Sequence, residues 1–263
     1  MAADLLLIVV AYHPTPAEVH TLVRCLSGLS PTFHVVVIAN DHQPGEPVDL
    51  LLPQANLFIT SRCNLGYARA FHEALSAYAA QAPLPAWVGV LNTDLSWQPG
   101  SFERMLGWLH QEPDVVLAVP RIVDPSGQLQ QLCKRDPTLL SLASRRFIPQ
   151  WLKPRWLRRY DSYHLMEDKS LDRVFDVPYL SGCCMLIKRA ALDASGGFDQ
   201  RFFLYLEDAD ISRTLRHYGR CVHLPFATIT HAWGRGNHRS LWLTLVNFHS
   251  AWIYFCKWGW RCI

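Results

Sequence analysis

The chain has 263 residues, half of them hydrophobic and 18% charged, so it is long and apolar enough to bury a full core and is not disordered. Its net charge is +3, and its eight cysteines include no C-x-x-C pair, which argues against a zinc knuckle or a disulfide framework. Reduced thiols, and an N-terminus with an acid but no basic segment, predict a cytoplasmic protein whose first apolar run is a buried strand.

The first forty residues predict a strand, a helix and a second strand. Leu5 to Ala11 is a continuous apolar run, as expected for a strand covered on both faces. Thr15 to Glu18 forms a capping box with proline at the first helical position, and Phe33 to Ala39 is the second strand. Such a strand, helix and strand unit crosses over right-handed and starts a parallel sheet.

Residues that follow these two strands are candidates for ligand binding, because open α/β sheets bind ligands beyond the carboxyl ends of their strands. Ala11, Tyr12 and His13 follow the first strand without a G-x-G-x-x-G, so the usual dinucleotide fingerprint is absent. Asn40 and Asp41 follow the second strand and could hydrogen-bond a base or a ribose. They are equally well explained as ordinary turn residues.

A third strand, Leu57 to Thr60, leads into a helix that runs to about Ala80. Asn64 and Gly66 lie at the junction, where exposed N–H groups could face a phosphate and Arg69 could add positive charge. A turn would use the same residues.

The next strand, Ala86 to Leu91, ends in Asn92-Thr93-Asp94. A carboxylate at the end of a central strand lies on the ligand-binding edge and suits Mg²⁺ or Mn²⁺ bridged to a diphosphate. The alternative for Asp94 is a simple turn former.

A basic window runs from Lys134 to Arg159, with eight basic residues and one acid. Tryptophan, phenylalanine and leucine are interleaved with the charges, so the window predicts contact with anionic lipid headgroups or a phosphorylated partner. No nucleic-acid-binding motif accompanies it, and a solvated basic loop is the alternative. Residues 133–172 show no sustained periodicity, and we expect them to face the acceptor or a membrane.

Three acids, Glu207, Asp208 and Asp210, follow an aromatic run and begin a segment with helical periodicity. Free N–H groups at a helix N-terminus stabilise carboxylates, so an acidic helix cap is one explanation. The other is a general base held on a rigid backbone.

His231 follows the last predicted strand, Ala227 to Thr230, and opens a Gly-rich loop that contains Arg235 and Arg239. Such a loop can close on phosphate oxygens, although a lone histidine is more often structural. Residues 241–263 are aromatic but too short and polar for a confident membrane span, which leaves an interfacial helix or a core helix.

Several blocks together carry a family resemblance. They are Tyr12-His13-Pro14, Asn64-Leu65-Gly66-Tyr67, Leu91-Asn92-Thr93-Asp94, Ser181-Gly182, and Gly196-Gly197-Phe198-Asp199 through Glu207-Asp208-Ala209-Asp210, with His231 after them. In order and spacing they resemble the family-two inverting glycosyltransferases of GT-A fold. Within that family the chain is most similar to bacterial rhamnosyltransferase-type enzymes of O-antigen and other surface-polysaccharide biosynthesis.

The resemblance implies an α/β protein of GT-A fold, with a Rossmann-like, mostly parallel central sheet flanked by helices. One domain, 1–263, would comprise a nucleotide-sugar half (1–125), an elaborated acceptor half (126–240) and a C-terminal aromatic helix (241–263). The partners would be a nucleotide-diphosphate sugar, with rhamnose as one candidate, and a saccharide or lipid-linked saccharide acceptor. We expect a location at the inner face of the plasma membrane, with contact through 134–159 and 241–263.

The resemblance also assigns roles. Asp208 would be the general base, Glu207 would orient it or the acceptor, and Asp94 and His231 would hold Mg²⁺ or Mn²⁺. The residues that would bind the nucleotide-sugar are Ala11, Tyr12, His13, Asn40, Asp41, Asn64, Gly66, Arg69, Asn92, Gly182, Arg235 and Arg239.

Two positions depart from the family pattern. Asn92 replaces the first acid of the D-x-D motif, and Ala39 stands where many relatives carry an aspartate. A nucleotidyltransferase and a non-catalytic saccharide-binding or scaffold protein remain the alternative functions, although no Gly-rich, Arg-containing activation loop follows the first strand.

Overall fold

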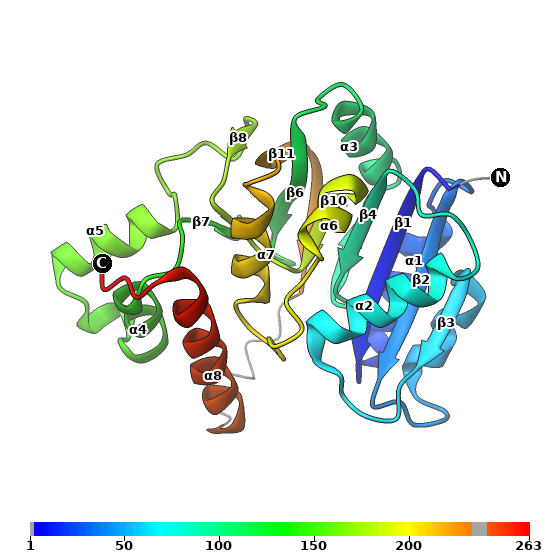
Figure 1. Cartoon of the computed structure of the whole chain (residues 1–263), viewed down its shortest axis with the longest axis horizontal. Helices are drawn as coiled ribbons and strands as arrows, with labels where there is room; N and C mark the ends of the chain where they lie inside the picture. The colour runs from blue at the N-terminus through cyan, green and yellow to red at the C-terminus, as the bar shows by residue number, and fades with distance from the viewer. Residues whose placement is uncertain (1–2, 233–240) are drawn as a thin grey trace.

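The computed structural model describes residues 3–232 and 241–263, and these residues are organised around a nine-stranded sheet (Figure 1). The first four strands in space are parallel: β3 (Leu57–Thr60), β2 (Phe33–Asn40), β1 (Leu5–Tyr12) and β4 (Trp87–Leu91). Beside them come antiparallel β10 (Cys184–Lys188), then β6 (Val115–Val123), β11 (Arg220–His231) and the edge strand β5 (Leu95–Trp97). A short strand, β8 (Phe175–Asp176), pairs with β11. Because β10 lies between β4 and β6, both halves of the chain share one sheet.

Helices cover both faces of the sheet, which explains the continuous apolar strands. One face packs against α1 (Pro16–Ser27) and α3 (Ser101–Leu109), and the other against α2 (Gly66–Ala79), α6 (Arg189–Ser195) and α7 (Glu207–Leu215). A 3₁₀ helix, η1 (Pro47–Gln54), packs beside α1. The predicted capping box is present, with Thr15 accepting from the Glu18 N–H and the Glu18 carboxylate accepting from the Thr15 N–H. The predicted mostly parallel sheet flanked by helices is confirmed.

The last predicted strands differ in detail from the structure. The sequence predicts two short strands, Cys221 to Leu224 and Ala227 to Thr230. In the structure they form the single strand β11, whose pairing with β6 shifts register between Leu224 and Thr228. Pro225 lies in this interval and has no N–H to donate to a neighbouring strand, so a bulge accommodates it.

Residues 133–172 contain helices that the sequence pattern does not reveal. After β7 (Cys133–Lys134), which pairs with β9 (Tyr179–Leu180), come α4 (Leu139–Phe147), η2 (Gln150–Leu152) and α5 (Arg155–His164). The buried residues of α4 are serines, and α5 buries Asp161 and His164 with Leu157. Asp161 accepts hydrogen bonds from Ser144 (2.8 Å) and from Lys153 (2.6 Å). Hydrophobic periodicity therefore misses helices whose buried faces are polar.

The C-terminal helix, α8 (Leu241–Trp258), packs on the core beside α7 (Figure 1). Tyr254 and Phe255 lie against Phe202 and Leu206, immediately before α7. The opposite side of α8 leaves large apolar side chains exposed, namely Leu241, Trp242, Leu245, Phe248 and Trp252. Among the described residues, α8 and the other helices lack the length and apolar character needed to cross a membrane.

Candidate active site

The first two parallel strands bring four of the predicted nucleotide-binding residues together. Tyr12 and Asn40 are Cα partners at the ends of β1 and β2. His13 Nε2 lies 3.4 Å from Asp41 Oδ2, and His13 Nδ1 lies 2.7 Å from Glu46 Oε1. His13 and Asp41 both adopt positive φ, 44° and 54°, so the backbone turns sharply here. The sequence analysis did not single out Glu46, which lies in an ordinary Gly-Glu-Pro turn.

The start of α2 is held against the segment that precedes the three acids. Asn64 Oδ1 accepts from the Gly66 N–H (2.9 Å), and the Tyr67 N–H donates to the Phe203 carbonyl (2.9 Å). Gly66 has φ +75°, and a Cβ at this position would lie 2.3 Å from the Phe203 oxygen. Only glycine fits both the backbone conformation and this close approach. The turn of Asn64 and Gly66 therefore holds the start of α2 against Phe203, in the segment that precedes the three acids.

Arg69 lies on the same helix, where its Nε donates to the Gln200 carbonyl at 3.2 Å. This hydrogen bond is a second contact between α2 and the segment that precedes the three acids. A role for Arg69 toward a nucleotide stays a prediction.

Asp94 and His231 meet at the ends of β4 and β11, as the shared role implied by the resemblance requires. Asp94 Oδ2 lies 3.1 Å from His231 Nε2, and the Ala232 N–H donates to the Asp94 carbonyl. Asp94 Oδ1 is buried and has no hydrogen-bond partner among the described residues. Such an orphaned carboxylate oxygen beside an imidazole nitrogen fits a divalent cation. Arg235 and Arg239 lie outside the described residues.

Gln130 fixes the orientation of the His231 ring. Its amide nitrogen donates to the His231 carbonyl (2.9 Å), which turns its oxygen toward His231 Nδ1 (3.1 Å). Nδ1 therefore donates to the Gln130 oxygen, and Nε2 faces the Asp94 carboxylate, so that a nitrogen and an oxygen ligand for one cation lie side by side. Asp94 and His231 are only two ligands, and the described residues contain no group of three or more His, Cys, Asp or Glu side chains arranged so that it could hold a metal ion. A cation held there needs further oxygen ligands, as diphosphate can supply.

The three neighbouring acids have different surroundings. Asp208 is partly exposed at the first turn of α7, and its Oδ1 accepts from the Tyr179 hydroxyl (3.0 Å) and the Ala209 N–H (2.9 Å). Its Oδ2 accepts from the Gly182 N–H (3.1 Å). A Cβ on Gly182 would lie 3.1 Å from the Asp208 Cβ, so glycine lets the two chains approach closely. Asp208 is thus oriented on both oxygens and still reaches solvent.

Glu207 is buried beside it, and its Oε2 has no hydrogen-bond partner among the described residues. Burial, and then the nearby Asp208 charge, raise the pKa of Glu207 to about 8. Glu207 therefore keeps its proton at neutral pH.

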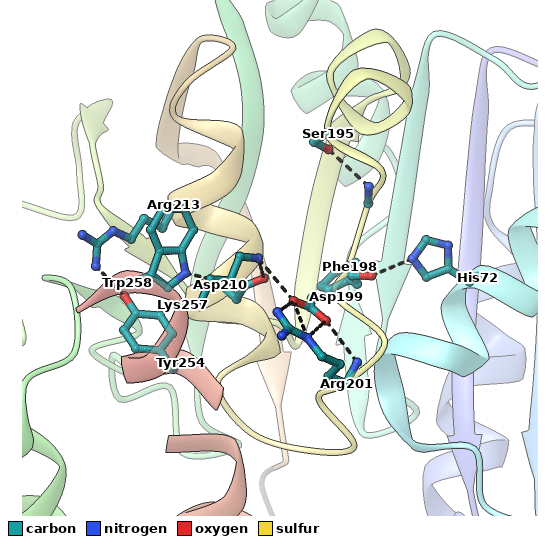
Figure 2. Close-up of polar contacts among 11 residues, drawn as sticks. His72, Ser195, Phe198, Asp199, Arg201, Asp210, Arg213, Tyr254, Lys257 and Trp258 are labelled. Atoms are coloured by element: carbon teal, nitrogen blue, oxygen red, sulfur yellow. Dashed lines mark hydrogen bonds and ion pairs between the residues drawn. The ribbon is translucent and has the colours of Figure 1, made fainter. Parts of the chain in front are cut away.

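Asp210 lies in a contact between two helices, which Figure 2 shows. Its carboxylate accepts from Lys257 Nζ (2.8 Å) and Trp258 Nε1 (2.7 Å), while Asp199 nearby pairs with Arg201 and also lies 3.4 Å from Lys257 Nζ. Burial raises the pKa of Asp210, and the hydrogen bonds from Lys257 and Trp258 oppose that rise. Asp210 thus joins α7 to α8.

The segment 182–183 links Asp208 to the Asn92 to Asp94 motif. The Gly182 carbonyl accepts from the Tyr67 hydroxyl (2.7 Å), and the Cys183 carbonyl accepts from the Asn92 N–H (3.0 Å). Burial raises the pKa of Cys183 to about 12, and both Asp94 and Asp208 contribute to the rise. Gly182 is therefore bonded directly to Asp208, and Cys183 is bonded to Asn92 in the motif that contains Asp94.

The chain matches a known family model over most of its length. The family model described as Glycosyl transferase family 2 matches residues 7–196. The chain belongs to glycosyl transferase family 2. This family 2 glycosyltransferase is 27% identical over 265 residues to N-acetylglucosaminyl-diphospho-decaprenol L-rhamnosyltransferase of Mycobacterium tuberculosis, covering 93% of this chain and 85% of the relative. It is therefore an enzyme that transfers a sugar, and the nucleotidyltransferase and non-catalytic alternatives are set aside.

Solved structures support the GT-A fold of this glycosyltransferase. One neighbour is GalNAc-T7 with UDP, GalNAc and Mn²⁺ (TM-score 0.60, 14% identity), covering 90% of this chain and 46% of the other. A second is the mannosyltransferase PcManGT of Pyrobaculum calidifontis with GDP-Man and Mn²⁺ (TM-score 0.59, 17% identity), covering 90% of this chain and 59% of the other. The chain thus spans about half the length of these solved proteins, and at these identities the likeness concerns the fold alone.

The sequence pattern did not single out Glu46, Gln130 and Tyr179 of the candidate site, and it included Tyr67 without a role. These residues are hydrogen-bond partners of predicted residues, and they come from distant parts of the chain. Only the Asn64-Leu65-Gly66-Tyr67 block carried a signal for one of them. The others could be found only from tertiary contacts.

Proposed function

We propose that this enzyme transfers a sugar from a nucleotide-diphosphate donor to a hydroxyl of a saccharide acceptor, with inversion at the anomeric carbon. The observation that carries this proposal is the position of the Asp208 carboxylate. This partly exposed carboxylate is oriented by Tyr179 and Gly182, and the segment 182–183 connects it to the Asp94 and His231 pair. A base and a site for the leaving group are thus available in one active site.

Asp208 would act as the general base. Its Oδ2 accepts one protein N–H, from Gly182, which leaves acceptor capacity for a substrate hydroxyl. As Oδ2 takes the hydroxyl proton, the acceptor oxygen forms a bond to the anomeric carbon, and the bond from that carbon to the donor diphosphate oxygen breaks. The electron pair leaves with the diphosphate, so one displacement inverts the centre and needs no enzyme nucleophile.

Asp94 and His231 would hold Mg²⁺ or Mn²⁺, which would supply positive charge against the leaving diphosphate. The orphaned Asp94 oxygen and the His231 ring fixed by Gln130 support this assignment. Asn92 leaves one carboxylate in this motif, so most of the remaining ligands would come from the donor.

The donor would lie at the edge formed by β1, β2 and the start of α2. Tyr12 is 54% exposed and offers a ring face to a nucleobase, while His13 and Asp41 lie beside it. Residues 1–125 would form the nucleotide-sugar half and 126–240 the acceptor half. The rhamnosyltransferase relative supports rhamnose as a candidate sugar and a lipid diphosphate-linked saccharide as the acceptor.

A lipid-linked acceptor would place the enzyme at a membrane surface through an aromatic surface formed by the basic window and α8. Its exposed apolar residues are Phe147, Trp151, Leu152, Trp156, Leu241, Trp242, Leu245, Phe248 and Trp252. Phe147 stacks on Phe248, with ring centroids 5.9 Å apart, which joins the two segments. Lys134 and Lys153 are buried, so the cationic charge of this surface is smaller than the sequence count suggests.

Replacing Arg155, Arg158 and Arg159 with glutamine should weaken binding to anionic vesicles about 100-fold, since each basic residue near such a surface contributes about 1 kcal/mol. Co-sedimentation with phosphatidylglycerol vesicles measures this. Arg189→Gln is the matched control, because Arg189 is an exposed cation on α6 that pairs with Asp193. Equal sedimentation of the triple variant and the wild type would refute the membrane contact.

The central experiment incubates the enzyme and Mn²⁺ with a panel of nucleotide-diphosphate sugars and an N-acetylglucosaminyl-diphospho-polyprenol acceptor. Mass spectrometry identifies the transferred sugar, and the NMR coupling of its anomeric proton and carbon gives the configuration. We expect one preferred donor and a product of inverted configuration. Retention of configuration would refute the single displacement by Asp208. The absence of transfer from every donor of the panel would refute the proposed acceptor class.

A further inference from the structure

Lys134 is a buried lysine whose charge no acid of the described chain balances directly. It is 9% exposed, and the pairing of β7 with β9 places it opposite Tyr179. Its Nζ lies 4.6 Å from the centre of the Tyr179 ring, and no described carboxylate forms an ion pair with it. A cation and ring contact gives part of the stabilisation that burial of an ammonium requires.

The other buried lysine of the basic window shows the usual solution. Lys153 Nζ lies 2.6 Å from Asp161 Oδ2, and both side chains are almost fully buried. Burying a charge is costly unless a partner compensates for it. Lys134 has no such partner, so an anion from a ligand would be favourable beside it.

Lys134 also lies on the acceptor side of the active site. Its partner Tyr179 donates to Asp208, the proposed base. Burial and then the charge of Arg145 lower the pKa of Lys134 to about 8, while the Asp208 charge acts in the opposite direction. Tyr179 thus contacts both Lys134 and Asp208, and this group is separate from the Asp94 and His231 pair proposed to serve the donor.

We propose that Lys134 binds a phosphate of the acceptor, so that the enzyme selects saccharides joined to a lipid through diphosphate. This inference rests on the proposed function and adds a binding site for the acceptor phosphate. The sugar hydroxyl would then reach Asp208 while the neighbouring diphosphate lies against Lys134. An ammonium is a suitable group for this purpose, because it acts as a point charge toward phosphate oxygens.

The test compares two acceptors that share N-acetylglucosamine, one linked to a short polyprenyl diphosphate and one to a neutral alkyl chain of similar length. KM and kcat are measured for both acceptors at saturating donor and Mn²⁺. In the wild type we expect the diphosphate acceptor to be preferred. Lys134→Met should raise its KM about 10- to 100-fold and change the kinetics of the neutral acceptor little. Lys134→Arg, which keeps the charge, should retain most of the preference.

Lys153→Met is the matched control, because it removes a buried lysine of the same window that has a carboxylate partner. We expect it to lower thermal stability but to leave the ratio of the two acceptors unchanged. If Lys134→Met lowers activity equally on both acceptors, the phosphate site is overturned. Lys134 would then stabilise the fold or support the base Asp208. A wild type that uses both acceptors equally would overturn the inference while sugar transfer stands. Transfer to neither acceptor would overturn the proposed acceptor together with the inference.

Discussion

Asp208→Asn is expected to lower kcat by about 10²–10⁴-fold, the usual contribution of a general base, while donor binding changes little. Asparagine keeps the shape of the side chain and can still accept from the Gly182 N–H, but it cannot take the acceptor proton. The measurement is kcat with saturating donor and acceptor, combined with calorimetric titration of the donor. Asp208 is linked to α2 indirectly, through the hydrogen bonds that Gly182 makes with Asp208 and with Tyr67, so the donor edge at β1 and β2 should keep its geometry.

Asp210→Asn is the matched control for this variant. Asp210 lies two residues away on the same helix, but its carboxylate is buried against Lys257 and Trp258 (Figure 2). We expect a loss of about 2 kcal/mol in the free energy of unfolding, because a charged hydrogen bond in the core is lost. The kcat of the folded fraction should stay within about twofold of the wild type, since general-base catalysis is untouched. Normal turnover by Asp208→Asn, or equal losses in both variants, would refute the base assignment.

Asp94→Asn is expected to weaken Mn²⁺ binding and to lower kcat/KM by about 10²–10³-fold, the usual cost of losing one electrostatic group that stabilises developing charge. The variant replaces the only carboxylate of the Asn92 to Asp94 motif with a neutral amide. Electron paramagnetic resonance titration of Mn²⁺ in the presence of nucleoside diphosphate measures the binding directly. The same titration in the wild type should also show weaker binding when nucleoside diphosphate is left out, because the cation needs its oxygens.

Asp172→Asn is the control for the cation prediction. Asp172 is an exposed acid that pairs with Arg121, away from the Asp94 and His231 pair, so neither Mn²⁺ binding nor kcat/KM should change. Full wild-type activity in excess chelator, together with an unaltered Mn²⁺ titration for Asp94→Asn, would remove Asp94 and His231 from the metal role.

Local sequence signals predicted the elements of the sheet well. The capping box of Thr15 and Glu18 involves residues three apart, so it is visible in a short window and is present in the structure. The strands β1 and β2 are apolar throughout because helices cover both faces of the sheet, and this leaves a clear mark in the sequence. The order of such elements predicts an α/β protein with a parallel sheet, whereas the GT-A fold was implied by the family resemblance.

The helices α4 and α5 show where the same approach fails. Their buried sides contain Ser144, Asp161 and His164, and these polar residues are tolerated because Ser144 and Lys153 hydrogen-bond to Asp161 inside the core. A pattern of hydrophobic residues cannot report such a face. The buried state of Lys134 and Lys153 was hidden for the same reason, and the sequence therefore predicted too much surface charge.

The sequence by itself determined the order of most strands and helices, the three acids at the start of one helix, and the carboxylate and histidine at the ends of two strands. The residue pattern could not distinguish Glu207, Asp208 and Asp210, because three carboxyl groups within four residues are chemically almost alike, and only the family resemblance singled out Asp208. The tertiary structure distinguished them: Glu207 is buried, Asp208 is oriented by Tyr179 and Gly182, and Asp210 pairs with Lys257. Those partners are 26 to 47 residues distant along the chain. Burial and such partners set the charge and direction of a carboxylate, and folding alone brings them together.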